Sequence, residues 1–227
     1  MTELRTFAPQ EKRGRAGNQE SEVAMTDPTA FGYDNWRFSW GDHICGFFDH
    51  PEQQLEVMVP FLAQGLRAGQ RCVWVGPAAS CERFRDCLGR IGGDLPTLEA
   101  SGQLVTISEV EFYLQDGMFE PTRSLQLMRT LLADGVAQGY ETMRLTTDIP
   151  WTHERRLDPE VWEEYEVRLN QEQAGLPIVS VCQYDRRQVT GGIIVAALRT
   201  HRYVILDGEL HVNPFYVPPT GRPARVT

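Results

Sequence analysis

The chain has 227 residues, of which 41% are hydrophobic and 10% aromatic, a composition that suits one large folded domain and excludes wholesale disorder. Its formal net charge of −9 repels phosphate backbones, so we expect no nucleic-acid binding. No segment approaches the roughly 18 apolar residues of a membrane span. The five cysteines form no CxxC pair, which favours reduced thiols and a cytoplasmic location.

The two ends of the chain have the composition of flexible segments. Residues 1–35 are polar and without periodicity, which predicts a disordered leader, and Met25 is an alternative start to Met1. Residues 220–227 are expected to form a flexible tail. The sequence therefore predicts a single folded domain over residues 36–219.

Short β-rich runs alternate with helical patterns along this domain. The predicted strands are, in chain order, 43–48, 72–75, 104–107, 143–147, 178–182 and 203–206. The predicted helices between them start at a proline or a capping residue: Pro51, Ser80, Pro121, Asp158 and Thr190. Strands separated by helices predict an α/β fold with a mostly parallel sheet and helices on both faces. The almost continuously apolar run 178–182 predicts the central strand.

The loop after the first predicted strand lies where a nucleotide-binding fold would carry a P-loop. A P-loop needs glycines that let backbone amides approach phosphate, and a lysine for the terminal phosphates. The sequence instead has Asp49, His50, Pro51 and Glu52, whose carboxylates repel phosphate. We therefore expect no ATP hydrolysis, no catalytic residues and no enzymatic activity.

His43 and Cys45 lie two residues apart, so they face the same side of the first predicted strand. An imidazole and a thiolate there could bind a metal or the polar end of a ligand. The alternative is a buried histidine beside an inert core cysteine. The remaining candidate metal ligands share no recognisable spacing: His50, His153, Cys182 and His201. We therefore expect neither a bound metal nor a cofactor.

Polar and aromatic residues follow the fourth and fifth predicted strands, at the edge where open parallel sheets bind ligands. The predicted ligand site gathers residues from several strand ends: His43, Cys45, Trp151, Tyr184 and Arg186. These types suit a small molecule with an apolar body and one polar or anionic end. In the alternative interpretation, Trp151 seals the core and Arg186 pairs with Asp185. Glu166 is also notable, because it lies four residues from Trp162 near the inward stripe of its helix.

Several short motifs occur in a fixed order through the predicted domain. They are the segments 41–45, 60–62, 65–72, 102–105, 182–187, 198–201 and 213–216, together with Trp151. This ordered set resembles the MEDS domain, a sensory domain named for methanogens, methylotrophs and the dichloromethane regulator DcmR, here in a stand-alone form. The resemblance implies a RecA/KaiC-like core without nucleotide chemistry. It also implies a role in sensing simple hydrocarbon derivatives, with a histidine-kinase or anti-sigma-type signalling partner.

The leading hypothesis is a sensory and regulatory domain that binds a small hydrocarbon-derived molecule and signals through a partner protein. Two alternatives stay open at this point. One is a degenerate nucleotide- or metal-dependent enzyme, and the other is a structural adaptor that binds a protein without any ligand. The sequence names neither the ligand, nor the partner, nor the oligomeric state.

Overall fold

The computed structural model describes residues 29–218. Most of the predicted leader, and the predicted tail at 220–227, lie outside the described residues. None of the helices within 29–218 is long and apolar enough to cross a membrane.

The last part of the predicted leader differs from expectation. β1 (Thr29–Ala30) pairs antiparallel with β2 (Arg37–Phe38), and Phe31 next to β1 is completely buried. The Phe31 ring packs against Trp36 and Phe61, at centroid distances of 5.3 and 4.5 Å. The prediction that the disordered leader extends to residue 35 is therefore wrong, because one aromatic side chain anchors this polar segment in the core.

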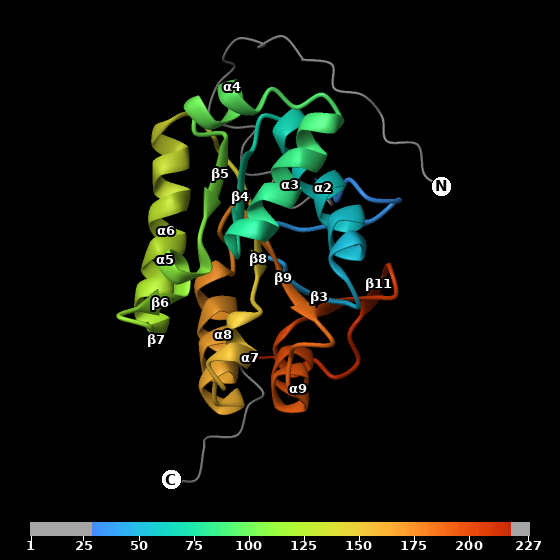
Figure 1. Ribbon diagram of the computed structural model, residues 1–227, viewed down its shortest axis with the longest axis vertical. Helices are drawn as coiled ribbons and strands as arrows, with labels where there is room; N and C mark the ends of the chain where they lie inside the picture. Colours follow the sequence, from blue (N-terminus) through green and yellow to red (C-terminus); the bar gives the residue numbers. More distant parts are fainter. Residues whose placement is uncertain (1–28, 219–227) are drawn as a thin grey trace.

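A seven-stranded sheet forms the centre of the domain (Figure 1). From edge to edge its strands are β11 (Glu209–Val212), β10 (Tyr203–Leu206), β3 (His43–Phe48), β9 (Ile178–Asp185), β8 (Met143–Asp148), β4 (Arg71–Val75) and β5 (Leu104–Ile107). Neighbouring strands are parallel except for the antiparallel pair β10–β11. All six predicted strands are present, and β9 is the central one, as its apolar run predicts.

The edge strand β11 was not predicted. Its side chains are mostly exposed, so it lacks the apolar alternation of a half-buried strand. Asp207 and Gly208, both at positive φ, make the two-residue turn that joins it to β10. An Asp-Gly pair is a strong hairpin signal, and it was the one local indication of this strand.

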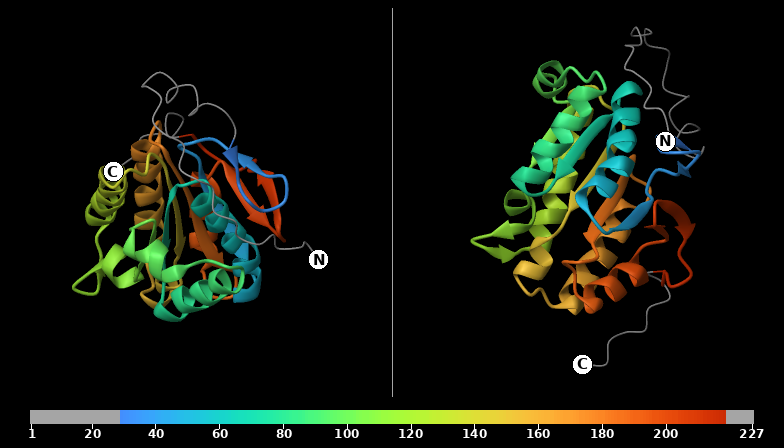
Figure 2. Two further views of the ribbon diagram at one scale, coloured as in Figure 1. Left: turned by 90° about the horizontal axis from the view of Figure 1, so that it is seen from above. Right: turned by 45° about the vertical axis from the view of Figure 1, so that its right-hand side comes forward.

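Helices cover both faces of the sheet, and Figure 2 shows the sheet between the two layers. One face, called here the α2 face, carries α2 (Pro51–Arg67), α3 (Ala78–Arg90) and α4 (Leu95–Ala100). The other, the α8 face, carries α5 (Glu109–Tyr113), α6 (Pro121–Ala137), α7 (Trp151–Glu154), α8 (Pro159–Gln173) and α9 (Gly191–Thr200). A small hairpin of β6 (Leu114–Gln115) and β7 (Met118–Phe119) precedes α6. The predicted α/β class with a mostly parallel sheet is confirmed.

Helix starts follow the capping rules for the most part. His50, Glu120, Asp158 and Thr190 each accept a backbone N–H of the first turn through their side chains, and they open α2, α6, α8 and α9. Ser80 was predicted to cap the second helix, but α3 begins two residues earlier, and Ser80 lies buried inside it.

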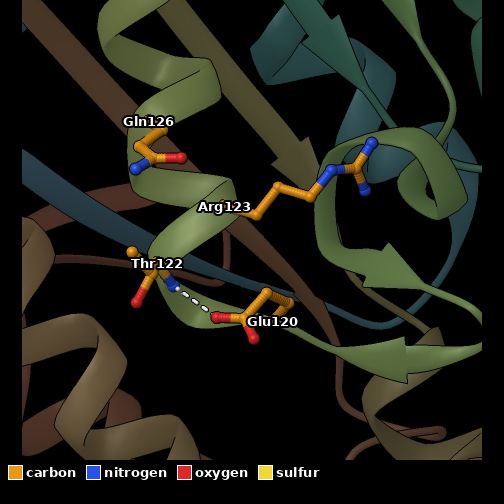
Figure 3. Close-up of a pocket in the computed structure, with 4 residues that line it drawn as sticks. All are labelled: Glu120, Thr122, Arg123 and Gln126. Atoms are coloured by element: carbon orange, nitrogen blue, oxygen red, sulfur yellow. Dashed lines mark hydrogen bonds between the residues drawn. The ribbon is translucent and has the colours of Figure 1, made fainter.

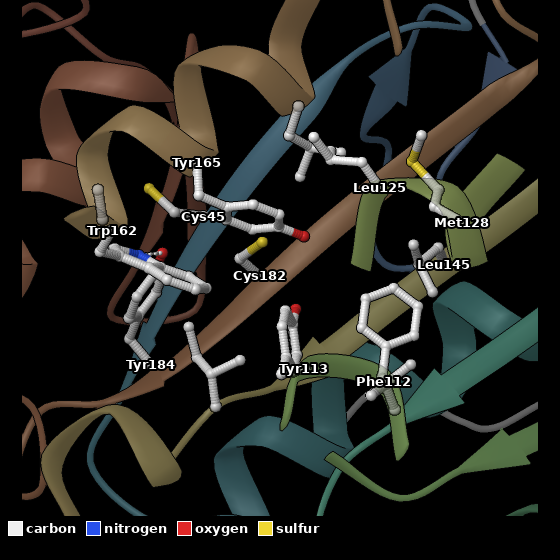
Figure 4. Packing of buried hydrophobic residues seen from close by; sticks show 14 of the residues in the cluster. Cys45, Phe112, Tyr113, Leu125, Met128, Leu145, Trp162, Tyr165, Cys182 and Tyr184 are labelled. Carbon is white, nitrogen blue, oxygen red and sulfur yellow. Dashed lines mark hydrogen bonds between the residues drawn. The ribbon is translucent and has the colours of Figure 1, made fainter. Parts of the chain in front are cut away.

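The sheet separates two hydrophobic clusters, because successive side chains of a strand point to opposite faces. In β3, Ile44 and Phe48 pack on the α2 face, whereas Cys45 and Phe47 pack on the α8 face. The α8 face is rich in buried aromatic rings, and Figure 4 shows several of them around Cys182. This aromatic layer surrounds the candidate site described next.

Candidate functional site

Four buried side chains with metal-binding or acid–base chemistry meet on the α8 face. They come from β3, α8, β9 and the end of α9, and they are His43, Glu166, Cys182 and His201. One nitrogen, sulfur or oxygen atom of each lies within 4.8 Å of those of the other three. None of the four residues is more than 3% exposed. We call this set the buried cluster.

Strand register and helix periodicity bring these residues together. His43 opens β3, and Cys182 lies in the neighbouring strand β9, opposite Cys45. Glu166 is on the buried stripe of α8, and His201 directly follows α9. α8 and α9 pack side by side over β3 and β9, so their inward side chains reach the sheet between them (Figure 1).

The donor atoms of the cluster converge on His43 Nε2. This nitrogen lies 3.2 Å from Cys182 Sγ, 3.0 Å from His201 Nε2 and 3.3 Å from Glu166 Oε2. His201 Nε2 is 3.7 Å from the same carboxylate oxygen. Two imidazoles, a thiol and a carboxyl group therefore point at one small volume.

Hydrogen bonds behind the rings fix both imidazole tautomers. His201 Nδ1 donates to the carbonyl oxygen of Ala197 at 2.8 Å. His43 Nδ1 lies 3.3 Å from Asn170 Oδ1, and Asn170 Nδ2 donates to the carbonyl of Thr200 at 2.6 Å, which sets the orientation of the amide. Both rings thus carry their hydrogen on Nδ1. In their neutral forms they present bare Nε2 lone pairs to each other.

Only one of the two oxygens of the Glu166 carboxyl group has a hydrogen-bond partner within the described chain. Its Oε1 accepts a hydrogen bond from the Tyr184 hydroxyl at 3.1 Å, which in turn accepts one from Trp162 Nε1 at 3.1 Å. Its Oε2 is completely buried and makes no hydrogen bond within residues 29–218, because its approach to His43 lacks hydrogen-bond geometry. Buried polar atoms without a partner are rare in native proteins and call for a physical reason.

Burial dominates the electrostatics of the cluster. It raises the pKa of Glu166 to about 8, although the Tyr184 hydrogen bond counteracts it in part. It lowers the pKa of His201 to about 4, and together with His201 it lowers the pKa of His43 well below its ordinary value. The pKa of Cys182 is raised well above its ordinary value, first by burial and then by Glu166. Each group by itself therefore favours its neutral form.

A second region of interest is a cavity of about 210 Å³ at the carboxyl edge of the sheet. It is lined by Pro51, Gln54, Pro77, Arg83, Asp148, Pro150, Asp185 and Gln188. Asp148 and Asp185 are the last residues of β8 and β9, and the other six belong to the segments that follow the four strands β3, β4, β8 and β9. We call it the edge cavity.

The edge cavity lies where the connections that follow neighbouring strands lead to opposite faces of the sheet. After β3 and β4 the chain continues to the α2 face, whereas after the neighbouring strands β9 and β8 it continues to the α8 face. Such topological switch points leave a crevice outside the strand ends, which is the usual ligand site of open α/β sheets. A cavity therefore lies at the carboxyl ends of the strands, but none of the five predicted ligand residues is among those that line it.

The polar groups of the edge cavity are two carboxylates, two amides and one guanidinium: Asp148, Asp185, Gln54, Gln188 and Arg83. Asp148 is 7% exposed and accepts from Gln54 Nε2 at 3.3 Å. Burial raises the pKa of the Asp148 carboxyl above its ordinary value, although hydrogen bonds from Ser80 and Gln54 partly offset it. Asp185 accepts hydrogen bonds from the backbone and side chain of Arg187, at 2.9 and 3.0 Å.

An open hollow of about 590 Å³ also lies at the start of α6 (Figure 3). Its lining residues are polar and exposed or half-exposed: Glu120, Thr122, Arg123 and Gln126. Glu120 caps the helix and Arg123 Nη1 donates to the carbonyl of Leu114. The hollow offers no enclosed apolar wall, so it lacks the character of a small-molecule site.

The turn that would carry a P-loop is an ordinary strand-to-helix connection. His50 Nδ1 accepts the backbone N–H of Gln53 at 3.3 Å and so caps α2. The Asp49 carboxylate is paired with Arg186. A helix start that is capped by a side chain and preceded by a carboxylate is unfavourable for phosphate.

The five residues of the predicted ligand site do not gather in one place. His43 and Tyr184 both contact Glu166, although His43 opens β3 and Tyr184 lies near the carboxyl end of β9. Cys45 is buried nearby, with its thiol directed at the carbonyl of Tyr203, 3.7 Å away.

Trp151 and Arg186 lie outside the cluster. Trp151 is 2% exposed, and its ring is 5.1 Å from Tyr113, 5.1 Å from Phe119 and 5.6 Å from Trp162 between centroids. This position matches the alternative in which Trp151 seals the core. Arg186 is at the surface and pairs with Asp49 and Asp207. Asp185 pairs with Arg187 and not with Arg186, because the turn presents Arg187 to that carboxylate.

Sequence reasoning missed the grouping of Glu166, Cys182 and His201 with His43. The sequence does mark Glu166 as a carboxylate on an apolar stripe, which is a costly place for an unpaired charge. Cys182 and His201 carry no comparable signal, since one lies within an apolar strand and the other follows a helix end.

Comparison with known proteins bears on the whole domain. Residues 42–202 match the family described as "MEDS: MEthanogen/methylotroph, DcmR Sensory domain". The transcriptional repressor DcmR of Methylorubrum extorquens is 26% identical over 164 residues, which cover 72% of this chain. The chain spans 59% of the length of that repressor.

The fold has a solved counterpart. A KaiC-like protein from the hyperthermophilic archaeon Pyrococcus horikoshii OT3 superimposes with a TM-score of 0.55 over 79% of both chains, at 15% identity. At that identity the likeness concerns the fold alone, and it confirms the KaiC-like core. The match over 42–202 takes in β3 to the end of α9 and confirms the resemblance seen in the sequence motifs. This chain therefore belongs to the MEDS family of sensory domains.

Proposed function

We propose that this protein senses a small molecule bound in the edge cavity and passes the signal to a partner protein. A sensory and regulatory role follows from membership of the MEDS family and from the relative that is a transcriptional repressor. The observation that supports this site is the position of the cavity, between segments that follow four neighbouring strands of the sheet. A ligand there contacts several elements at once, so its binding can shift their relative positions.

The size and lining of the cavity favour a particular ligand class. Its volume of about 210 Å³ is below the ~300–1,000 Å³ of pockets for drug-sized ligands, so a molecule of a few heavy atoms suits it better than a nucleotide. Three prolines supply apolar walls: Pro51, Pro77 and Pro150. The carboxylates of Asp148 and Asp185 favour a ligand with an O–H or N–H donor over the anionic end that the sequence suggested. A short alcohol or amine, which is a simple hydrocarbon derivative, meets both requirements.

The enzyme alternative has less support. A nucleotide-dependent reaction needs a phosphate cradle, and the turn from Asp49 to Glu52 holds carboxylates and a helix cap instead. The KaiC-like neighbour supports a shared fold and carries no argument for shared chemistry. We therefore propose a regulatory role without catalysis. The partner that fits the family resemblance is a histidine-kinase or anti-sigma-type signalling protein.

An NMR titration of the isotopically labelled chain tests the ligand site. The probes are a panel of alcohols, amines and haloalkanes with about one to four carbons, the size that the cavity admits. We expect chemical-shift changes to cluster at 51–54, 77–83, 148–150 and 185–188. Asp148→Asn is expected to weaken binding of an amine probe at least about tenfold, because a charge-assisted hydrogen bond is lost.

The matched control is Asp86→Asn, an exposed carboxylate of α3, which leaves binding unchanged. Shift changes centred on the aromatic residues of the α8 face, or no response to any compound of the panel, would contradict this site. Equal weakening by Asp86→Asn and Asp148→Asn would show that only the overall charge of the protein matters.

A further inference from the structure

The two histidines of the buried cluster present a specific problem. With Nδ1 of each ring donating to an oxygen, the neutral rings place two Nε2 lone pairs 3.0 Å apart. Glu166 Oε2, an acceptor without a hydrogen bond within the described chain, lies 3.3 Å from one of them and 3.7 Å from the other. Three lone-pair-bearing atoms facing one another repel unless a shared proton or a bound cation lies between them.

We propose that His43, Glu166, Cys182 and His201 bind one transition-metal ion of the Zn²⁺ class. The donor set contains two imidazole nitrogens, one sulfur and one carboxylate oxygen, all of which are established Zn²⁺ ligands. Imidazole and thiolate donors favour Zn²⁺ and its neighbours over Mg²⁺ or Ca²⁺, which take oxygen ligands. The site lies apart from the edge cavity, so this inference goes beyond the proposed sensory function.

The spacing of the donors fits a tetrahedral ion. Zn²⁺ holds nitrogen, oxygen and sulfur at about 2.0–2.3 Å, and a tetrahedron of that size has edges of about 3.3–3.8 Å. The four donor-to-donor distances given above run from 3.0 to 3.7 Å. The two remaining distances, from Cys182 Sγ to His201 and to Glu166, are within 4.8 Å.

The residues behind the donors provide the outer support that metal sites need. Metal-bound histidines usually donate their second nitrogen to a carbonyl or carboxylate, which orients the ring and raises its basicity. Here His201 Nδ1 donates to the carbonyl of Ala197, and His43 Nδ1 donates to Asn170 Oδ1. Tyr184 donates to Oε1 of Glu166, the oxygen that faces away from the histidines. These contacts orient three of the four donors before any ion enters.

The surroundings indicate a structural ion and not a catalytic one. A catalytic zinc keeps a position open for water or substrate, whereas a structural zinc has four protein ligands in a closed site. All four donors are buried and come from four different elements, β3, β9, α8 and the residue after α9. The ion would therefore fasten two helices to the centre of the sheet and offset the cost of burying the carboxylate and the thiolate.

Metal analysis of the intact chain tests the proposal. Protein purified without chelator, or metal-free protein given Zn²⁺ and then desalted, is expected to hold about one Zn²⁺ per chain by native mass spectrometry. Substitution with Co²⁺ is expected to give the intense visible absorption of a tetrahedral site together with a thiolate-to-metal charge-transfer band. Zn²⁺ is also expected to raise the melting temperature, because the folded state alone holds the assembled site.

Variants assign the site to these residues. Cys182→Ala should abolish the charge-transfer band, and Glu166→Gln should weaken Zn²⁺ binding. Asn170→Ala, behind His43, should weaken it about 10–100-fold, the usual cost of losing an outer partner. The matched control is Cys72→Ala, which removes an equally buried thiol on the α2 face and should leave metal content and spectrum unchanged.

Three results would overturn the proposal. One is an unmodified chain that holds no Zn²⁺ and whose melting temperature Zn²⁺ leaves unchanged, in which case the four groups share a proton. Another is a Co²⁺ spectrum of the unmodified chain without a thiolate band, which decides the matter even if Cys182→Ala fails to fold. The third is loss of metal in Cys72→Ala to the same extent as in Cys182→Ala.

Discussion

The guanidinium of Arg144 donates a hydrogen bond of 2.6 Å to the backbone carbonyl of Phe31, 113 residues earlier in the chain. The same side chain donates to Gln70 Oε1 and to the carbonyls of Phe61 and Ala30. One buried arginine in β8 thus holds the segment around β1 against α2 and the sheet. It explains why a polar stretch of sequence belongs to the folded domain.

We therefore expect Arg144→Met to be strongly destabilising. The variant keeps much of the side-chain volume but leaves three buried acceptors and one partly buried acceptor without their donor, at about 1–3 kcal/mol for each one that water cannot reach. Urea denaturation should show a loss of at least about 3 kcal/mol in the free energy of unfolding. Arg90→Met, at an exposed position of α3, should change it by less than about 0.5 kcal/mol. A small effect of Arg144→Met would show that the β1 segment adds little to the fold.

Trp151→Ala separates a core role from a ligand role for that ring. Because Trp151 packs among buried aromatic residues, the variant should lose about 3–5 kcal/mol of unfolding free energy. Phe215→Ala, whose ring is 64% exposed, should stay within about 0.5 kcal/mol of the parent protein. A Trp151→Ala variant that is stable but fails to bind a ligand identified by NMR would show that Trp151 is a ligand-binding residue.

Arg186→Ala is expected to have a small effect that depends on salt. Its ion pairs with Asp49 and Asp207 are partly exposed, and such pairs contribute about 0–1 kcal/mol each. The difference between variant and parent in unfolding free energy should shrink as ionic strength rises, because salt screens exposed charges. A large difference that persists in high salt would indicate a structural role for this arginine.

The five thiols should react in a definite order with an alkylating reagent. Cys87 is half-buried on α3, with Arg90 Nη2 2.8 Å from its sulfur, and should react first. Cys81 should react more slowly, because burial raises its pKa to about 11 and the thiolate is the reactive form. Three thiols are buried and should react only after unfolding: Cys45, Cys72 and Cys182. Mass spectrometry of timed samples checks this order, and early labelling of Cys182 would contradict its enclosure in the cluster.

Asp185 should make the stability of the domain sensitive to acid. Burial by itself raises the pKa of Asp185, but hydrogen bonds from Arg187 and Gln188 outweigh it and hold the pKa below its ordinary value. The stabilisation is therefore present above the unfolded-state pKa of about 3.9 and is lost as the pH falls through the folded-state value. The difference in unfolding free energy between the parent and Asp185→Asn should therefore narrow as the pH falls from about 5 through the folded-state pKa. A difference in unfolding free energy that stays constant as the pH falls would contradict a lowered pKa of Asp185 in the folded state.

Local patterns in the sequence were sufficient for most of the fold. The six parallel strands and the helices between them follow from runs of β-formers, helical periodicity and capping residues, all of which act within a few residues. The central place of β9 follows from its unbroken apolar run, since only a strand covered on both faces needs one. The segment around Phe31 and the strand β11 were missed because their composition is that of surface loops.

The site depended on contacts that no local pattern records. A zinc finger can be recognised because its ligands lie a few residues apart on one short unit. Here the paired histidines, His43 and His201, are 158 residues apart. Cys182 reaches them from a second strand and Glu166 from another helix. The sequence by itself indicated only that Glu166 lies near the inward stripe of its helix and that His43 and Cys45 face the same side of one strand. Only the tertiary structure decided that the four positions coincide, because the crossovers of the parallel sheet bring the start of β3 beside β9 and lay α8 and α9 over both.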